Sequence, residues 1–148
     1  MMTLEERAEA VWRMLGQALD GDADGAAHSL MTIGQQSTTA DMYGVCCAIA
    51  EGGAAVLRRI FPAMIWEPSE AMVTLHEMQP GALGADPMET WAARFLVAYA
   101  NRDSDQTRAL FDAALANGSD FYSQSVCALL GTFAGLGRAR LREQGIPL

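Results

Sequence analysis

The stretch that decides the fold is "STTADMYGVCCAIAEGGAAVLRRI", residues 37–60. Its apolar and small side chains recur at helical spacing. One face of a helix would carry Met42, Val45, Cys46, Ile49, Gly53, Val56, Leu57 and Ile60. No strand-like alternation of any length competes with this pattern elsewhere in the chain. We therefore predict a long buried helix here and an all-α fold.

The composition fits one compact domain spanning residues 1–148. Hydrophobic residues make up 51% of the chain and charged residues 19%, which suits a folded protein rather than a disordered one. The longest uncharged run, residues 121–137, is at the lower limit for a membrane span and contains polar residues, so a buried helix is the better interpretation. We see no pattern of a secretory signal and expect a cytoplasmic protein without a membrane span.

Capping signals divide the rest of the chain into further helices. Thr3 and Glu6 form a capping box at the start of the first helix, and Gly21 is a natural stop at its end. Asp86 and Pro87 open another helix. We predict helices over about 4–19, 22–34, 87–101, 103–117 and 119–142, with a proline-rich connector at 61–86 that holds one short helix. The first helix has apolar residues at helical spacing: Leu4, Ala8, Val11, Trp12, Leu15 and Leu19.

The second half of the chain resembles the first at a constant offset of 81 residues. Positions 13–59 and 94–140 share seven identities in 47 positions, where chance gives roughly three. Helix ends and acidic turns coincide at the same offset. We predict two similar three-helix units, 3–60 and 87–143, related by internal duplication. Small residues at matching positions, Ala50 and Ala54 with Gly131 and Gly135, predict close approach of the two long helices.

The acidic stretch "DGDADG", residues 20–25, looks like the start of a calcium loop. An EF-hand loop needs a bidentate glutamate at its twelfth position, which here is Met31. Helix capping explains the stretch more simply, with Asp22 as the cap and Asp24 in the first turn of the next helix. The second copy, with Asp103 and Asp105, has the same form. We therefore interpret both stretches as structural.

The two hairpins resemble the tetratricopeptide repeat family. The first carries Trp12, Leu15, Gly16 and Leu19, followed by Gly21, Asp22, Ala26, Leu30 and Ile33. The second carries Tyr99, followed by Arg102, Asp103, Thr107, Phe111 and Ala114. In that family the first helix of each hairpin lines a concave surface that grips an extended peptide. The resemblance therefore implies peptide binding near Arg13, Gln17 and Arg94.

Metal and nucleophile chemistry finds little support. Cys46, Cys47 and Cys127 lie in apolar stretches and are expected to be buried small residues. Zinc sites need more Cys or His ligands than these spacings bring together. Met72, His76 and Met78 could suggest copper(I), but methionines more often fill a core or form an adaptable surface. We expect no metal and no cofactor.

Charge excludes some partners and leaves others open. The net charge is −8 and every basic residue is arginine. Direct nucleic-acid binding is unfavourable because phosphate contacts need clustered cations. An acidic mimic of nucleic acid remains an alternative. Arginines at the ends of the two long helices complement the helix dipoles or bind an anion: Arg58, Arg59, Arg138, Arg140 and Arg142.

The leading functional hypothesis is a non-enzymatic interaction or regulatory module. It would bind a protein or peptide, or associate with itself as a homodimer. The candidate contact residues are Arg13, Gln17, Arg94, Phe61, Met64 and Trp66. The alternative is a small-molecule-binding protein or enzyme with a pocket between the two units, lined by Trp66, His76, Trp91 and Cys127.

Overall fold

The computed structural model describes residues 1–60 and 86–145, which form helices joined by short turns. The helices are α1 (Leu4–Leu19), α2 (Ala23–Gln35), α3 (Thr39–Ile60), α5 (Pro87–Ala100), α6 (Ser104–Ala116) and α7 (Ser119–Glu143). No strand occurs in these two ranges, and the all-α prediction is confirmed. The short helix predicted within 61–86 lies outside the described residues.

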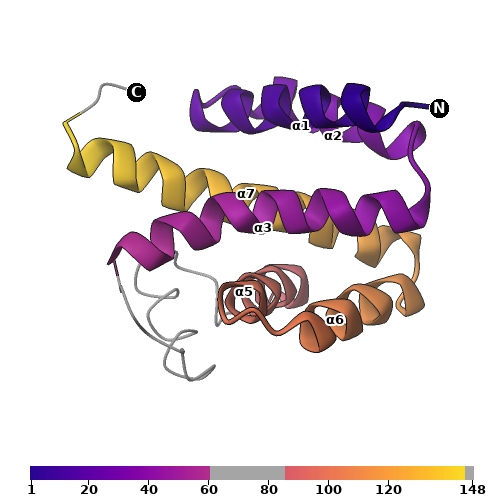
Figure 1. The fold of residues 1–148 in the computed structure, drawn as a ribbon. Coiled ribbons are helices and arrows are strands. Elements are labelled where there is room, and N and C mark those ends of the chain that lie inside the picture. The colour runs from indigo at the N-terminus through magenta and orange to yellow at the C-terminus, as the bar shows by residue number, and fades with distance from the viewer. Residues whose placement is uncertain (61–85, 146–148) are drawn as a thin grey trace.

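The helices form three layers (Figure 1). The α1–α2 hairpin makes one outer layer and the α5–α6 hairpin makes the other. Between them lie α3 and α7, which contact each other and run in the same direction (Figure 1). This arrangement puts the two longest helices at the centre of the fold, as their apolar faces require.

Side-chain caps fix the helix starts that the sequence predicts. The Thr3 hydroxyl accepts a hydrogen bond from the Glu6 amide at 3.1 Å, and the Glu6 carboxylate accepts one from the Thr3 amide at 2.9 Å. The capping box before α1 is therefore confirmed. At the start of α5 the Asp86 carboxylate accepts from the Met88 amide at 2.9 Å, with Pro87 in the first turn.

The two acidic turns are helix caps, as predicted. Asp22 accepts a hydrogen bond from the Gly25 amide at 2.9 Å before α2. Asp103 accepts one from the Gln106 amide at 3.1 Å before α6. Each carboxylate satisfies an amide that has no partner inside its helix, and it also complements the positive end of the helix dipole.

The local geometry repeats at the offset of 81 residues, but the packing of the two halves differs. Helices α2 and α6 have 13 residues each, and Gly21 and Arg102 precede their caps with positive φ angles of 83° and 57°. However, α5 packs against α3, α6 and α7, whereas α1 packs mainly against α2 and α7. Common origin of the two units stays a prediction.

The predicted close approach at Gly131 is wrong. A Cβ atom added there would meet nothing within 4 Å, because Gly131 is exposed. The close approaches of α3 to its neighbours lie at two other glycines. A Cβ on Gly52 would clash with the Phe133 ring of α7, and a Cβ on Gly53 would lie 2.9 Å from a Leu96 methyl of α5. Glycine at these two positions lets α3 lie close to both neighbours.

The core of the molecule follows the central layer. Side chains of α3 and α7 meet those of α5 here, and most are fully buried. The largest are Phe95, Phe111, Met14, Ile33, Ile49, Leu57, Leu96, Leu129 and Leu136. The inward faces predicted for α2 and α3 are largely confirmed, since Ala26, Leu30 and Ile33 are buried together with most of the predicted α3 face.

Candidate functional site

Helix α1 has an apolar face that the fold covers only on one side. Val11, Met14 and Ala18 are buried. Leu4 and Trp12, which belong to the apolar stripe seen in the sequence, are 76% and 77% exposed. The fold therefore leaves these two residues of the stripe uncovered. The reason is the position of α1 in an outer layer, where the central helices reach only part of its apolar surface.

Comparison with α5 shows what is missing around α1. Seven of the 14 residues of α5 are buried, because both long helices and α6 surround it. Ala93, which lies 81 positions after Trp12, is only 1% exposed. Only three of the 16 residues of α1 are buried. Helix α1 thus exposes a large aromatic residue to solvent at a position whose equivalent in α5 is a buried alanine.

The uncovered residues form one row along the helix. Leu4, Ala8 and Trp12 are each four residues apart, so they lie in line on the outer surface of α1, and all three are exposed. We call this row the α1 ridge. Large exposed apolar groups in a row are typical of interaction sites on soluble proteins.

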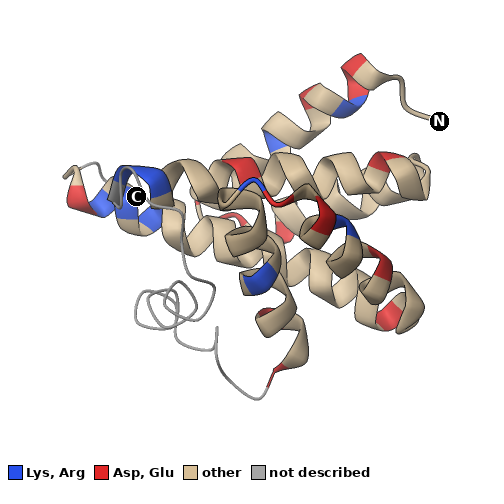
Figure 2. Cartoon of the chain, turned by 60° about the horizontal axis from the view of Figure 1, so that its bottom comes forward, with Lys and Arg blue, Asp and Glu red and all other residues tan. Residues whose placement is uncertain are grey.

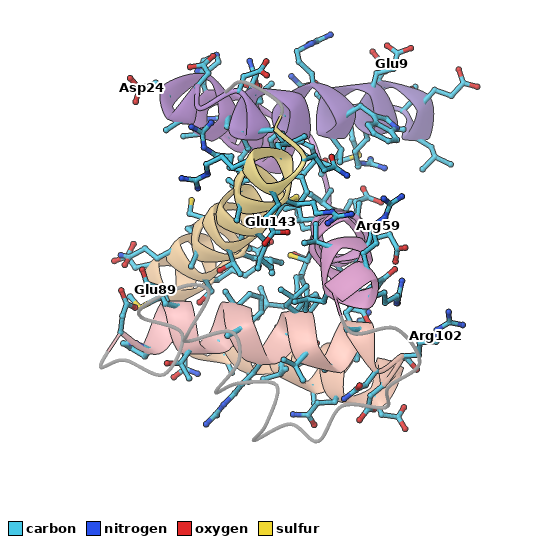
Figure 3. The ribbon with its side chains drawn as sticks, turned by 90° about the vertical axis from the view of Figure 1, so that its left-hand side faces the viewer. Glu9, Asp24, Arg59, Glu89, Arg102 and Glu143 are labelled. Atoms are coloured by element: carbon cyan, nitrogen blue, oxygen red, sulfur yellow. The ribbon has the colours of Figure 1, made fainter. Side chains whose placement is uncertain are left out.

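A charged row borders the α1 ridge on its solvent side. Glu5, Glu9 and Arg13 are again four residues apart, and all are exposed. Figure 3 shows Glu9 on the outer side of the hairpin, pointing away from the central layer. In Figure 2 the N-terminal turns of α1 project beyond the other helices. A partner could therefore reach the ridge and its charged border together.

Arg7 anchors these N-terminal turns from the other side of α1. Its guanidinium donates to the Ser37 hydroxyl at 3.1 Å, to the Met2 carbonyl at 3.1 Å and to the Asp41 carboxylate at 3.0 Å. The Thr38 backbone hydrogen bond, with a smaller contribution from Arg7, lowers the pKa of Asp41. Arg7 is 11% exposed, so these contacts hold α1 against the turn before α3. The N-terminal turns of α1, which carry part of the α1 ridge, are therefore held in place.

The residues predicted to bind a partner are separated by the fold. Arg13 is exposed directly beside Trp12. The Gln17 amide oxygen instead accepts a hydrogen bond from the Ser29 hydroxyl at 2.7 Å and so links α1 to α2. Arg94 is exposed on α5, across the central layer from α1 (Figure 1). Phe61, Met64 and Trp66 lie outside the described residues.

Leu4, Ala8 and Trp12 were not among the predicted contact residues. A signal for them exists in the sequence. The apolar stripe of residues 4–19 covers two adjacent rows of the helix, Leu4 to Trp12 and Val11 to Leu19, which is wider than one neighbouring helix covers. The sequence alone does not tell which row is left uncovered.

A polar cleft of about 430 Å³ lies between α3 and the α5–α6 turn. Tyr43, Cys47, Glu51 and Arg58 line it from α3. The Tyr43 hydroxyl and the Thr107 hydroxyl hydrogen-bond at 2.8 Å, and Glu51 pairs with Arg58 at 3.3 Å.

The other wall of the polar cleft contributes Tyr99 from α5 and residues of the α5–α6 turn. Burial, with a further contribution from Glu51, raises the pKa of Tyr99 to about 12. The neutral Tyr99 hydroxyl can donate or accept a hydrogen bond in the cleft.

A second cleft of about 430 Å³ lies between the α1–α2 turn and α7 and is mostly apolar. Its lining consists of small residues together with Leu30, Leu130, Cys127 and Arg138. Arg138 donates to the Leu19 carbonyl at 2.9 Å and so closes the C-terminus of α1. Cys127 is exposed here, so its predicted burial is wrong. Cys127 is exposed because it lines this open cleft, which the α1–α2 hairpin does not fill.

Of the residues predicted for a pocket between the units, the structure describes only Trp91 and Cys127. Trp91 is 5% exposed, donates its indole N–H to the Leu110 carbonyl at 2.7 Å and stacks on Phe95. It is a core residue of the α5–α6 hairpin. Trp66 and His76 lie outside the described residues.

The arginine clusters of the long helices meet at one end of the molecule, since α3 and α7 end on the same side (Figures 2 and 3). Four of the five arginines have partners within the chain. Arg58 pairs with Glu51, and Arg140 pairs with Glu143 at 3.6 Å. Arg138 donates to the Leu19 carbonyl, and Arg142 donates to the Arg138 carbonyl at 3.4 Å. These contacts are of the structural kind expected for arginines near helix C-termini.

The thiols of the described residues are poorly suited to nucleophilic attack. Burial raises the pKa of Cys46 to about 12, and it also raises the pKa of Cys47 and Cys127. A neutral thiol is a weak nucleophile and a weak metal ligand. No group of three or more His, Cys, Asp or Glu side chains within 1–60 and 86–145 could hold a metal ion.

Protein-family models, curated proteins and solved structures give no match to this chain. Among the described residues, only residues 39–59 form a helix long and apolar enough to cross a membrane. This helix is α3, which lies between the two hairpins. The cytoplasmic location stays a prediction.

Proposed function

We propose that this protein is a helical interaction module that docks an amphipathic helix of a protein partner on the α1 ridge. The observation that carries the proposal is the exposure of Trp12 and Leu4 on one row of a helix whose inner face buries Val11, Met14 and Ala18. Tryptophan is among the residues that contribute most to protein interfaces. The resemblance of the hairpins to tetratricopeptide repeats supports the same class of function.

The ridge is large enough to matter energetically. A tryptophan that is 77% exposed offers roughly 150 Å² for burial, which corresponds to about 4 kcal/mol before ordering costs are subtracted. Ala8 between the two large residues leaves room for the backbone of a partner helix. The exposed guanidinium of Arg13 adds a charged contact at the border of the apolar patch.

Site-specific photo-crosslinking tests the proposal. A photoreactive amino acid at Ala8 should capture a partner in cells, and the crosslinked peptide should map to an amphipathic helix. Leu115 is an exposed apolar residue on α6, at 37%, and serves as the matched control position. Capture from position 8 should disappear when Trp12 is replaced by aspartate. Equal capture from positions 8 and 115, or capture unaffected by the Trp12 substitution, would contradict the proposal.

A second candidate function is binding of a small polar molecule in the cleft between α3 and the α5–α6 turn. Its volume of about 430 Å³ and its tyrosine and hydroxyl lining favour such a ligand. A metabolite screen by thermal shift tests this, because a ligand that binds only the folded state raises the melting temperature. A ligand whose shift survives Tyr99→Phe and Thr107→Val together would bind elsewhere.

A further inference from the structure

The charges along the border of the α1 ridge follow a definite order. Along the row Glu5, Glu9 and Arg13, the charge changes from negative at the N-terminal side to positive at the C-terminal side. The ridge itself has a large residue at each end, Leu4 and Trp12, and the small Ala8 at its centre. Both rows therefore match their own reversed copies.

We infer that the helix docked on the α1 ridge is α1 of a second copy of this chain, crossing it antiparallel about a two-fold axis near Ala8. This inference rests on the proposed function and names its partner. Two such rows of residues spaced by four pack together at about −50°, the commonest crossing of helices in globular proteins. A small residue at the crossing point allows the closest approach of the two backbones.

The antiparallel arrangement pairs unlike side chains across the interface. Trp12 of each copy lies beside Leu4 of the other, so both large exposed groups become covered. Glu5 lies three residues before Ala8 and Arg13 five residues after it. At 1.5 Å per residue, Glu5 of one copy and Arg13 of the other differ by about 3 Å along the axis, which long side chains easily span. Two ion pairs thus form at the rim.

Glu9 is the unfavourable element of the same arrangement. It lies one residue from the two-fold axis, so the two copies of Glu9 approach each other and repel. A contact between two single helices is smaller than a standard protein interface of about 1,600 Å². We therefore expect a reversible dimer with a Kd on the order of 10–100 µM.

Sedimentation equilibrium from 1 to 500 µM tests the inference. The wild-type chain should pass from monomer to dimer across this range. Trp12→Ser and Leu4→Ser should each weaken the dimer by 30-fold or more, whereas Leu115→Ser should leave its Kd unchanged. Far-UV circular dichroism and thermal unfolding at 1 µM confirm that each variant is folded. A wild-type chain that is monomeric at 500 µM, or a dimer that survives both substitutions, would overturn the inference.

Charge exchange tests the antiparallel orientation specifically. Glu5→Arg and Arg13→Glu should each weaken the dimer about 3- to 10-fold, because each places like charges opposite one another. The double variant should restore the wild-type Kd, and Glu9→Gln should tighten it. Additive losses in the double variant would contradict this geometry. If the chain stays monomeric while crosslinking from Ala8 still captures another protein in a Trp12-dependent manner, self-association fails and the interaction module stands.

Discussion

Replacing Gly52 by alanine perturbs the closest contact between α3 and α7. Alanine favours a helix over glycine by about 0.5–1 kcal/mol. At Gly52, however, the new methyl group would overlap the ring of Phe133, which is 7% exposed and surrounded by core residues. Overpacking of this kind costs about 1–3 kcal/mol. The net expectation is a loss of about 0.5–2 kcal/mol in the free energy of unfolding.

Gly44 supplies the matched control on the same helix. A Cβ atom there meets nothing within 4 Å, and the position is exposed, so Gly44→Ala should gain up to about 1 kcal/mol. Gly131→Ala on α7 should behave like Gly44→Ala for the same reason. Urea unfolding followed by circular dichroism at 222 nm gives all three values. A Gly52→Ala variant as stable as the Gly44→Ala variant would refute the packing of α3 on α7 described above.

Three further outcomes are expected. Thr107→Val should destabilise the fold by about 1–2 kcal/mol in urea unfolding, because it removes the hydrogen bonds to Tyr43 and to the Ser104 carbonyl. Thr132→Val, the control, loses one local hydrogen bond on α7 and should cost less than about 0.5 kcal/mol. The hydrogen bonds to Thr3 and Thr38 lower the pKa values of Glu6 and Asp41, so these carboxylates stabilise the fold fully above about pH 4.5 and lose this effect as the pH falls through their folded-state pKa values. Asp41→Asn should therefore make the free energy of unfolding less dependent on pH in the acid range. An unchanged pH dependence would count against this assignment. Iodoacetamide at pH 8 should alkylate exposed Cys127 first, half-buried Cys47 more slowly and Cys46 only after unfolding, as peptide mass spectrometry would show; early modification of Cys46 would contradict its burial.

Much of the fold could be predicted because helix ends are local. Thr3, Asp22, Asp86 and Asp103 cap helices through residues two or three positions ahead, so their roles are visible in the sequence. Apolar spacing likewise gave the inward faces of α2 and α3. These features depend on contacts within one or two helical turns, which the sequence order itself defines.

The errors concern the side of a helix that its neighbours cover. Trp12, Gly131 and Cys127 all satisfy helical spacing, but all three are exposed, Trp12 on the outer side of α1 and the other two at an open cleft beside the α1–α2 hairpin. Which row of side chains is covered depends on the relative placement of the three layers, and that placement depends on contacts between residues far apart in the chain. The candidate site could not be located for this reason, although its neighbour Arg13 was among the predicted contact residues.

The free energy of unfolding of Trp12→Ala, measured below 1 µM and so well under the expected dimer Kd, tests most directly the claim that this tryptophan belongs to a partner surface and not to the core. A residue that is 77% exposed should cost less than about 0.5 kcal/mol when it is truncated. Trp91→Ala, at a site that is 5% exposed, should cost about 3–5 kcal/mol in the same experiment. A loss of more than about 2 kcal/mol for Trp12→Ala would place Trp12 inside the fold and remove the α1 ridge as an interaction site.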